Sequence, residues 1–269
     1  MTVFQALVLG ILQGLAEFLP ISSSAHLALA PWAFGWPEPG LAVDVALHVG
    51  TLVAVLVYFR DEWIKLIAAA LEIVRTQRIQ TSEQKRVVFL LVATIPGGLA
   101  GVFLNDYAES SFRSPALIAV ALAAMGVLLW LVDRMRPATR SLNEIRWSDA
   151  ILIGVAQAAA LLPGVSRSGA TITAGRALDL DRGSAATFSF LMSMPIIAAA
   201  ALFKVPHLLH SGGASLPLLV GVTASAVSGW LAIAIVMRYV RTNSYGVFAV
   251  YRVLLGAAVL ALFYARARG

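Results

Sequence analysis

The chain has 269 residues, of which 59% are hydrophobic and only 13% are charged, and it contains no cysteine. An average soluble domain has about 25% charged residues, so this composition indicates a polytopic membrane protein with one integral domain, and it excludes disulfide and thiol chemistry. A net charge of +6 could suggest nucleic-acid binding, but most of the excess lies between apolar runs, where it sets membrane topology, so we expect no nucleic-acid partner.

Residues 1–40 are expected to form a re-entrant helical hairpin. An apolar run carries Gln13 and Glu17 and is followed by Pro20 and a serine cluster at residues 22–24. Proline stops one short helix and serine caps the next, so the turn is expected at residues 20–24. Polar groups inside a membrane are costly, and a functional site is therefore the default interpretation.

Three apolar runs follow, at residues 41–59, 87–104 and 116–132. The basic segments at 60–86 and 134–146 are expected on the cytoplasmic side. The connection at 105–115 carries Asp106, Glu109 and Arg113 and is expected outside, which places both ends of the first hairpin outside as well.

The second half predicts the mirror image. A short run at residues 150–162 meets Pro163 and Gly164, and the chain returns to a charged segment at 176–182. This is a second hairpin, entered from the cytoplasm, and spans at 185–203, 216–236 and 247–265 follow, with His207 and His210 outside. The expected fold is an all-α polytopic membrane protein with two inverted-topology repeats, about 1–132 and 149–265. Each repeat has a re-entrant helical hairpin and three full transmembrane helices, an architecture typical of transporters.

The two hairpins resemble each other in sequence. Residues 10–26 and 154–171 both run from glycine through glutamine and a Leu-Pro pair to a serine cluster. With a one-residue gap, Gln13 aligns with Gln157, Pro20 with Pro163 and Ser23 with Ser166. The pattern predicts that the hairpins form two halves of one buried polar site.

The first segment carries groups for metal binding and for acid, base or nucleophilic chemistry. Gln13 and Glu17 share one helical face, where their oxygens would suit Mg²⁺; a helix-packing hydrogen bond is the alternative. Ser23 and His26 are candidates for attack or proton transfer. Ser22 and Ser24 are equally well explained as helix caps.

The second segment is a candidate phosphate site. Arg167 is flanked by hydroxyls and glycines at the expected start of a helix. A guanidinium gives charge-assisted bonds to phosphate, and a helix N-terminus favours anions. A structural arginine that reaches the interface is the alternative. Asp44 and His48 lie one turn apart, and Asp44 could orient either His48 or Arg252; contacts with lipid headgroups explain them as well.

The segments Gln13–His26 and Pro163–Thr171 resemble the two signature motifs of the bacterial undecaprenyl-diphosphate phosphatase family, of the bacitracin-resistance protein type. Residues 44–52, 188–191 and 249–252 extend the resemblance over most of the chain. It implies hydrolysis of undecaprenyl diphosphate to undecaprenyl phosphate and inorganic phosphate, which recycles the lipid carrier for cell-wall synthesis and confers bacitracin resistance. It also implies a multi-pass protein of the bacterial cytoplasmic (inner) membrane, among membrane lipids, with an extracytoplasmic site and a divalent cation, Mg²⁺ or Ca²⁺.

The resemblance also implies roles for single residues. They are catalytic for Glu17, His26, Ser23 and Arg167, phosphate-binding for Ser24, Ser166, Arg167, Ser168 and Thr171, metal-binding for Glu17 and Gln13, and supporting for Asp44, His48 and Arg252. Many family members have glutamate where this chain has Gln13, so Glu17 is expected to carry the metal or base role alone. Ala25 and His48 replace a common glycine and a common glutamine.

Three points stay open at the level of sequence. The attacking group is Ser23, His26 or water. An inverted-repeat transporter or flippase of a phosphorylated lipid or anion is the alternative function, although Glu17, His26 and the hydroxyl cluster exceed what binding alone requires. The small residues Ala123, Ala124 and Gly126 permit close helix contact and are compatible with a homodimer.

Overall fold

A computed structural model of the chain describes residues 1–111, 114–210 and 215–268, without the side chains of residues 41, 42, 104–111, 203–205 and 207–210. Arg113 and the side chains of Asp106, Glu109, His207 and His210 therefore lie outside the described part. Over the described ranges the chain is helical, with no β-strand. The α-helices are α1 Val3–Phe18, α2 Ser23–Phe34, α3 Leu41–Tyr58, α4 Arg60–Thr76, α5 Ser82–Ser111, α6 Pro115–Met135, α7 Trp147–Ala158, α8 Arg167–Ala177, α9 Arg182–His210, α10 Leu216–Tyr239 and α11 Gly246–Arg268.

Within the described ranges, five helices are long and apolar enough to cross a membrane. They are α5, α6, α9, α10 and α11, and each contains one of the spans expected from sequence. The sixth expected span lies in α3, which meets the same criteria only together with α4, after a bend of 85°. The expectation of an all-α, multi-pass membrane protein is confirmed.

The basic segment at residues 60–86 was expected as a loop, and this was wrong. It contains α4 and the start of α5, and ion pairs of 3.0 Å between Glu62 and Lys65 and between Glu72 and Arg75 support α4 from one turn to the next. Glu62 also pairs with Arg86 of α5 at 2.8 Å. Charge counting predicts the side of the membrane and not the conformation of the segment.

Both expected helix breaks are present. α1 ends at Phe18 and α2 begins at Ser23; a 3₁₀ turn, η2 Ala159–Leu161, follows α7, and α8 begins at Arg167. Ser22 and Ser166 are the N-caps, with φ of 77° and 73°, and their hydroxyls accept hydrogen bonds from the backbone three residues on. The structure thus matches Ser22, and not Ser23, with Ser166. The one-residue gap of the sequence alignment is wrong, because the prolines stand at different positions in the two turns.

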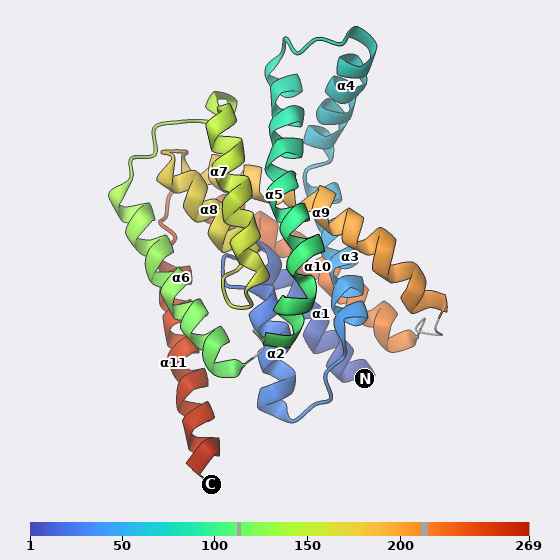
Figure 1. Ribbon diagram of the computed structural model, residues 1–269, viewed down its shortest axis with the longest axis vertical. Coiled ribbons are helices and arrows are strands. Elements are labelled where there is room, and N and C mark those ends of the chain that lie inside the picture. The colour runs from blue at the N-terminus through green and yellow to red at the C-terminus, as the bar shows by residue number, and fades with distance from the viewer. Residues whose placement is uncertain (112–113, 211–214, 269) are drawn as a thin grey trace.

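Glycines let the short helices press against long ones. α1 packs most extensively on α10, and α7 on α5. A methyl group at Gly10 would overlap the carbonyl oxygen of Gly221, and one at Gly154 would lie 2.6 Å from that of Ala93. The two breaks consequently lie in the middle of the molecule, between the longer helices (Figure 1).

α6 and α11 pack together in the same way. A methyl group at Gly126 would lie 3.1 Å from the carbonyl oxygen of Ala249, and one at Gly256 would lie 2.6 Å from that of Ala119 and 3.4 Å from Ala123. Gly126 and Ala123, which sequence offered for contact between copies, are therefore used within the chain.

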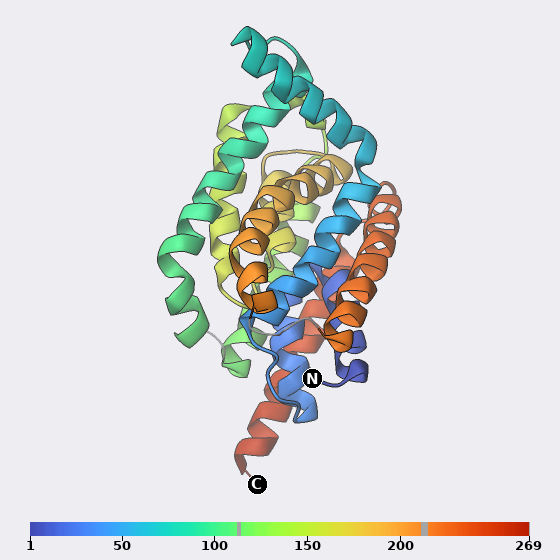
Figure 2. The same ribbon diagram turned by 90° about the vertical axis from the view of Figure 1, so that its right-hand side faces the viewer.

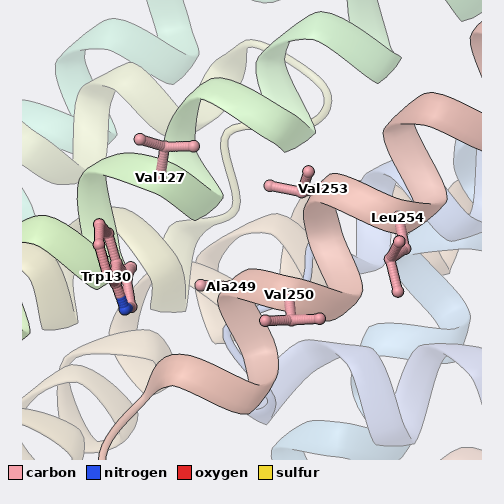
Figure 3. A pocket seen from close by; sticks show the side chains of 6 residues that line it. All are labelled: Val127, Trp130, Ala249, Val250, Val253 and Leu254. Carbon is pink, nitrogen blue, oxygen red and sulfur yellow. The ribbon is translucent and has the colours of Figure 1, made fainter.

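Both chain termini lie toward one end of the molecule, and α4 lies at the other end (Figures 1 and 2). Two apolar grooves lie on the outer surface. One, of about 250 Å³, runs between α6 and α11 and is lined by Val127, Trp130, Ala249, Val250, Val253 and Leu254 (Figure 3). The other, of about 750 Å³, runs between α1 and α10.

Gly10→Ala is expected to lower the midpoint of thermal unfolding in detergent by several degrees, because overpacking costs about 1–3 kcal/mol. The matched control is Gly98→Ala in α5, where a methyl group would meet no atom within 4 Å. Equal midpoints for the two variants would contradict the close approach of α1 and α10.

Candidate active site

The carboxylate of Glu17 joins the two helix breaks. Glu17 lies in the last turn of α1 and is only 5% exposed. Its Oε1 accepts a hydrogen bond of 2.7 Å from Nη2 of Arg167, and its Oε2 accepts bonds of 2.6 Å from Ser23 Oγ and 3.1 Å from Gln13 Nε2. Residues 150 positions apart in sequence thus share one carboxylate, as the paired segments predicted.

His48 of α3 approaches the same carboxylate. Its Nε2 lies 3.4 Å from Glu17 Oε2, and its Nδ1 lies 2.7 Å from the backbone oxygen of Asp44. A carbonyl oxygen only accepts, so Nδ1 carries the proton of that bond. Asp44 therefore orients His48 through its backbone carbonyl.

Arg167 is fixed at the first position of α8. Its Nη1 donates to the backbone oxygen of Ser189 at 3.0 Å, and the Ser189 hydroxyl lies 2.7 Å from that of Thr171. Sequence reasoning missed Ser189. The only signal was its position in the segment 188–191, which contributes to the family resemblance.

These groups surround a cavity of about 260 Å³. Its polar lining residues are Glu17, Ser23, Ser24, His48, Gln157, Ser166 and Arg167. Ser168 and Thr171 are buried beside it and are not among the residues that line it: the Ser168 hydroxyl donates to the backbone oxygen of Leu19 at 3.3 Å, and that of Thr171 donates to Arg167 at 2.8 Å. The two hydroxyls connect the helix breaks and secure α8.

His26 faces α11, and it is not among the residues that line the cavity. Its Nδ1 donates to the backbone oxygen of Ser22 at 2.7 Å, and in the neutral ring Nε2 accepts from the Tyr251 hydroxyl at 2.7 Å. The His26 and Tyr251 rings are stacked, with centroids 5.8 Å apart. Tyr251 is a second residue whose contact sequence reasoning did not anticipate.

Arg252 is fully buried and binds both helix breaks. Its guanidinium donates to the backbone oxygens of Pro20 at 2.9 Å, Gly164 at 2.8 Å and Val165 at 2.9 Å, and Nε donates to Leu122 of α6 at 3.0 Å. Carbonyls at a helix break have no partner within the helix, so these bonds satisfy groups that would otherwise be buried without one.

A divalent cation fits only with ligands from outside the protein. No group of three or more histidine, cysteine or acidic side chains occurs among the residues described. Gln13 contacts Glu17 but is not among the residues that line the cavity. Its Oε1 is buried and has no hydrogen-bond partner in that part of the chain. One carboxylate and one amide oxygen suit Mg²⁺ when phosphate oxygens and water complete its shell.

Arg252→Met is expected to lower the unfolding midpoint strongly, because each buried carbonyl left without a donor costs about 1–3 kcal/mol. Arg252→Lys should restore part of the loss. Arg241→Met removes an arginine from an exposed position and serves as the control. Equal midpoints for the methionine variants, measured by thermal unfolding, would contradict the role of Arg252 at the breaks.

Comparison with known proteins identifies the family. Residues 6–258 match the family model described as bacitracin resistance protein BacA. The undecaprenyl-diphosphatase of Gemmatimonas aurantiaca is 59% identical over 99% of this chain and 100% of its own length, and that of Pelotomaculum thermopropionicum is 49% identical over 100% of both chains. The undecaprenyl-diphosphatase of Moorella thermoacetica is also 49% identical, over 99% of this chain. The chain belongs to the BacA bacitracin resistance protein family.

Proposed function

We propose that this protein is an undecaprenyl-diphosphatase, which hydrolyses undecaprenyl diphosphate to undecaprenyl phosphate and inorganic phosphate. The reaction recycles the lipid carrier for cell-wall synthesis and accounts for bacitracin resistance. The names of its full-length relatives support this function. The observation that carries it is the hydrogen bond of 2.6 Å from Ser23 to Glu17, in one cavity with Arg167.

Ser23 is the proposed nucleophile. Its Oγ attacks the terminal phosphorus, the bond from that phosphorus to the bridging oxygen breaks, and undecaprenyl phosphate leaves. Glu17 accepts the hydroxyl proton, since a nucleophile and its base must lie within hydrogen-bond reach. Water then hydrolyses the phosphoserine and releases inorganic phosphate.

Arg167 binds the diphosphate and neutralises charge that develops during transfer. Ser24 and Ser166 line the cavity and add hydroxyl contacts. Ser168 and Thr171 position α8, and Asp44, through its carbonyl, positions His48. His26 acts from outside the cavity, through Ser22 and Tyr251, and Arg252 holds the two turns together.

Glu17 and the unpartnered Gln13 Oε1 would hold a divalent cation, Mg²⁺ or Ca²⁺. When bound, the cation neutralises the negative charge of the diphosphate. Because this chain offers a single carboxylate there, oxygens of the substrate are needed to complete the site.

We also propose that the whole chain is one integral domain made of two inverted repeats. Three correspondences support this: the caps Ser22 and Ser166, the contacts of Gly10 with α10 and of Gly154 with α5, and the reciprocal glycine contacts between α6 and α11. The segment at residues 60–86, which includes α4 and carries six lysine or arginine residues, lies opposite the termini. The positive-inside rule therefore supports an extracytoplasmic position for the end from which α1 and α2 enter. The site then faces the extracytoplasmic side of the cytoplasmic membrane.

The alternative, a transporter or flippase without hydrolysis, is not favoured. Its anion site would require Arg167, but not a serine hydroxyl bonded to a carboxylate. The relatives are named as diphosphatases.

Ser23→Ala is expected to abolish release of phosphate from undecaprenyl diphosphate, a loss of at least about 100-fold, because it removes the nucleophile. Wild-type protein should form a phosphoenzyme that this variant lacks, measured with labelled substrate, with and without Mg²⁺ or Ca²⁺. Ser24→Ala, the matched control, should retain the phosphoenzyme. A phosphoenzyme in Ser23→Ala would exclude Ser23, and no phosphate release from folded wild type would favour the transporter.

His26→Ala is expected to lower kcat less than Ser23→Ala does. Tyr251→Phe removes only the hydroxyl that donates to His26, so it should have no further effect in the His26→Ala background. The measurement is a double-mutant cycle on kcat and KM. Additive effects would show that Tyr251 acts independently of His26.

A further inference from the structure

The cavity has one polar and one apolar side. Its apolar lining consists of Gly97 of α5, Ala160 and Leu161 of η2, and Ile196 and Ile197 of α9. A prenyl diphosphate has the same division into a charged end and a long apolar chain. With the phosphates against Arg167, the chain has to leave between α5 and α9, because the other lining residues carry hydroxyl, amide, imidazole or charged groups.

The repeat relates α5 and α9 to α10 and α3, yet the two pairs pack differently. On the α3–α10 side, a methyl group at Gly50 would overlap the carbonyl oxygen of Val222, and the Ser225 hydroxyl donates to Leu47 at 2.8 Å. Contact between α5 and α9 is much less extensive. In Figure 1 the C-terminal half of α9 runs away from α5.

One position differs between the two pairs. Gly221 of α10 and Ala93 of α5 occupy equivalent places, since they contact Gly10 and Gly154. Four residues further on, α10 has Ser225 and α5 has Gly97. Gly97 has no hydroxyl with which to bind α9. It lines the cavity, and a methyl group there would lie 2.5 Å from Nε2 of Gln157 in α7.

Small residues follow on both helices beyond the cavity. Gly101 follows Gly97 by one turn on the same face of α5, and a methyl group there would meet no atom within 4 Å. Ala200 follows Ile196 by one turn on α9 and is exposed. α5 and α9 both run toward the end that carries the chain termini (Figures 1 and 2), so the two small residues extend the opening in the same direction.

Neither outer groove is as suitable an exit for the prenyl chain. The larger one is lined on α1 by Leu7, Ile11 and Leu15. Gln13 lies two residues from Ile11 and from Leu15, hence on the opposite face of α1. The groove of Figure 3 shares no lining residue with the cavity.

We propose that the opening between α5 and α9 is a lateral portal, through which the prenyl chain of the bound substrate passes into the lipid while its diphosphate occupies the cavity. The proposal rests on the proposed function, because it takes a prenyl diphosphate as the ligand.

The absence of cysteine permits a direct test with single-cysteine variants in proteoliposomes. Ala200→Cys places a thiol at the portal, and the matched control Ala224→Cys places one in the α1–α10 groove. The measurement is the rate of labelling by an apolar maleimide, alone, with undecaprenyl diphosphate and with isopentenyl diphosphate, which has the same charged end and almost no chain.

Undecaprenyl diphosphate is expected to slow labelling of Ala200→Cys by about tenfold, as for a site largely occupied by ligand, and to leave Ala224→Cys unchanged. Isopentenyl diphosphate should protect neither thiol. Three outcomes would overturn the portal: protection of Ala224→Cys alone, protection of neither thiol, and equal protection of Ala200→Cys by both ligands. Phosphate release by wild type is measured in parallel: protection without release would leave the portal standing and refute the hydrolase, whereas release without protection would do the reverse.

Discussion

Two helix breaks in the middle of a membrane protein leave backbone carbonyls without hydrogen-bond donors, at a depth where water cannot supply them. The site depends on which side chain donates to these carbonyls. Arg252 donates to carbonyls of both breaks and of α6. Its hydrogen-bond acceptors are all backbone oxygens, so the position of its guanidinium fixes one turn relative to the other. That position in turn fixes the caps Ser22 and Ser166 and the first residues of α2 and α8.

The ion pair between Glu17 and Arg167 is the chemical consequence of this arrangement. Each side chain adjoins a different break, and only the meeting of the two breaks brings them to 2.7 Å. Ser23 directly follows the cap of α2, and Arg167 directly follows the cap of α8. The first residue of each helix therefore contributes to the proposed reaction, Ser23 as the nucleophile and Arg167 as the guanidinium that binds the diphosphate.

Apolar runs, proline and charge were sufficient to predict the membrane-spanning helices and the two breaks, and the similarity of the two short segments predicted that Glu17 and Arg167 would share one site. They could not predict α4 as a helix, because charge counting carries no conformational information, nor the register of the two turns, because the prolines are not equivalent. The contacts of Arg252, Ser189 and Tyr251 involve residues distant in sequence, and a backbone carbonyl as partner leaves no trace in the sequence. The sequence could not predict that His26 lies against α11 and outside the cavity, because this too depends on a contact with a residue distant in sequence.

The proposed repeat relates two pairs of helices that pack differently in the structure. Ser225 binds α10 to α3, whereas α5 has Gly97 four residues after its contact with Gly154, and the small residues Gly101 and Ala200 follow along the proposed portal. A symmetric protein would have either two openings or none, and neither suits a substrate with one charged end and one long apolar end. The proposed portal supplies the asymmetry that such a ligand requires, because one helix pair packs closely and the other does not, while Glu17 and Arg167 stay together at the centre.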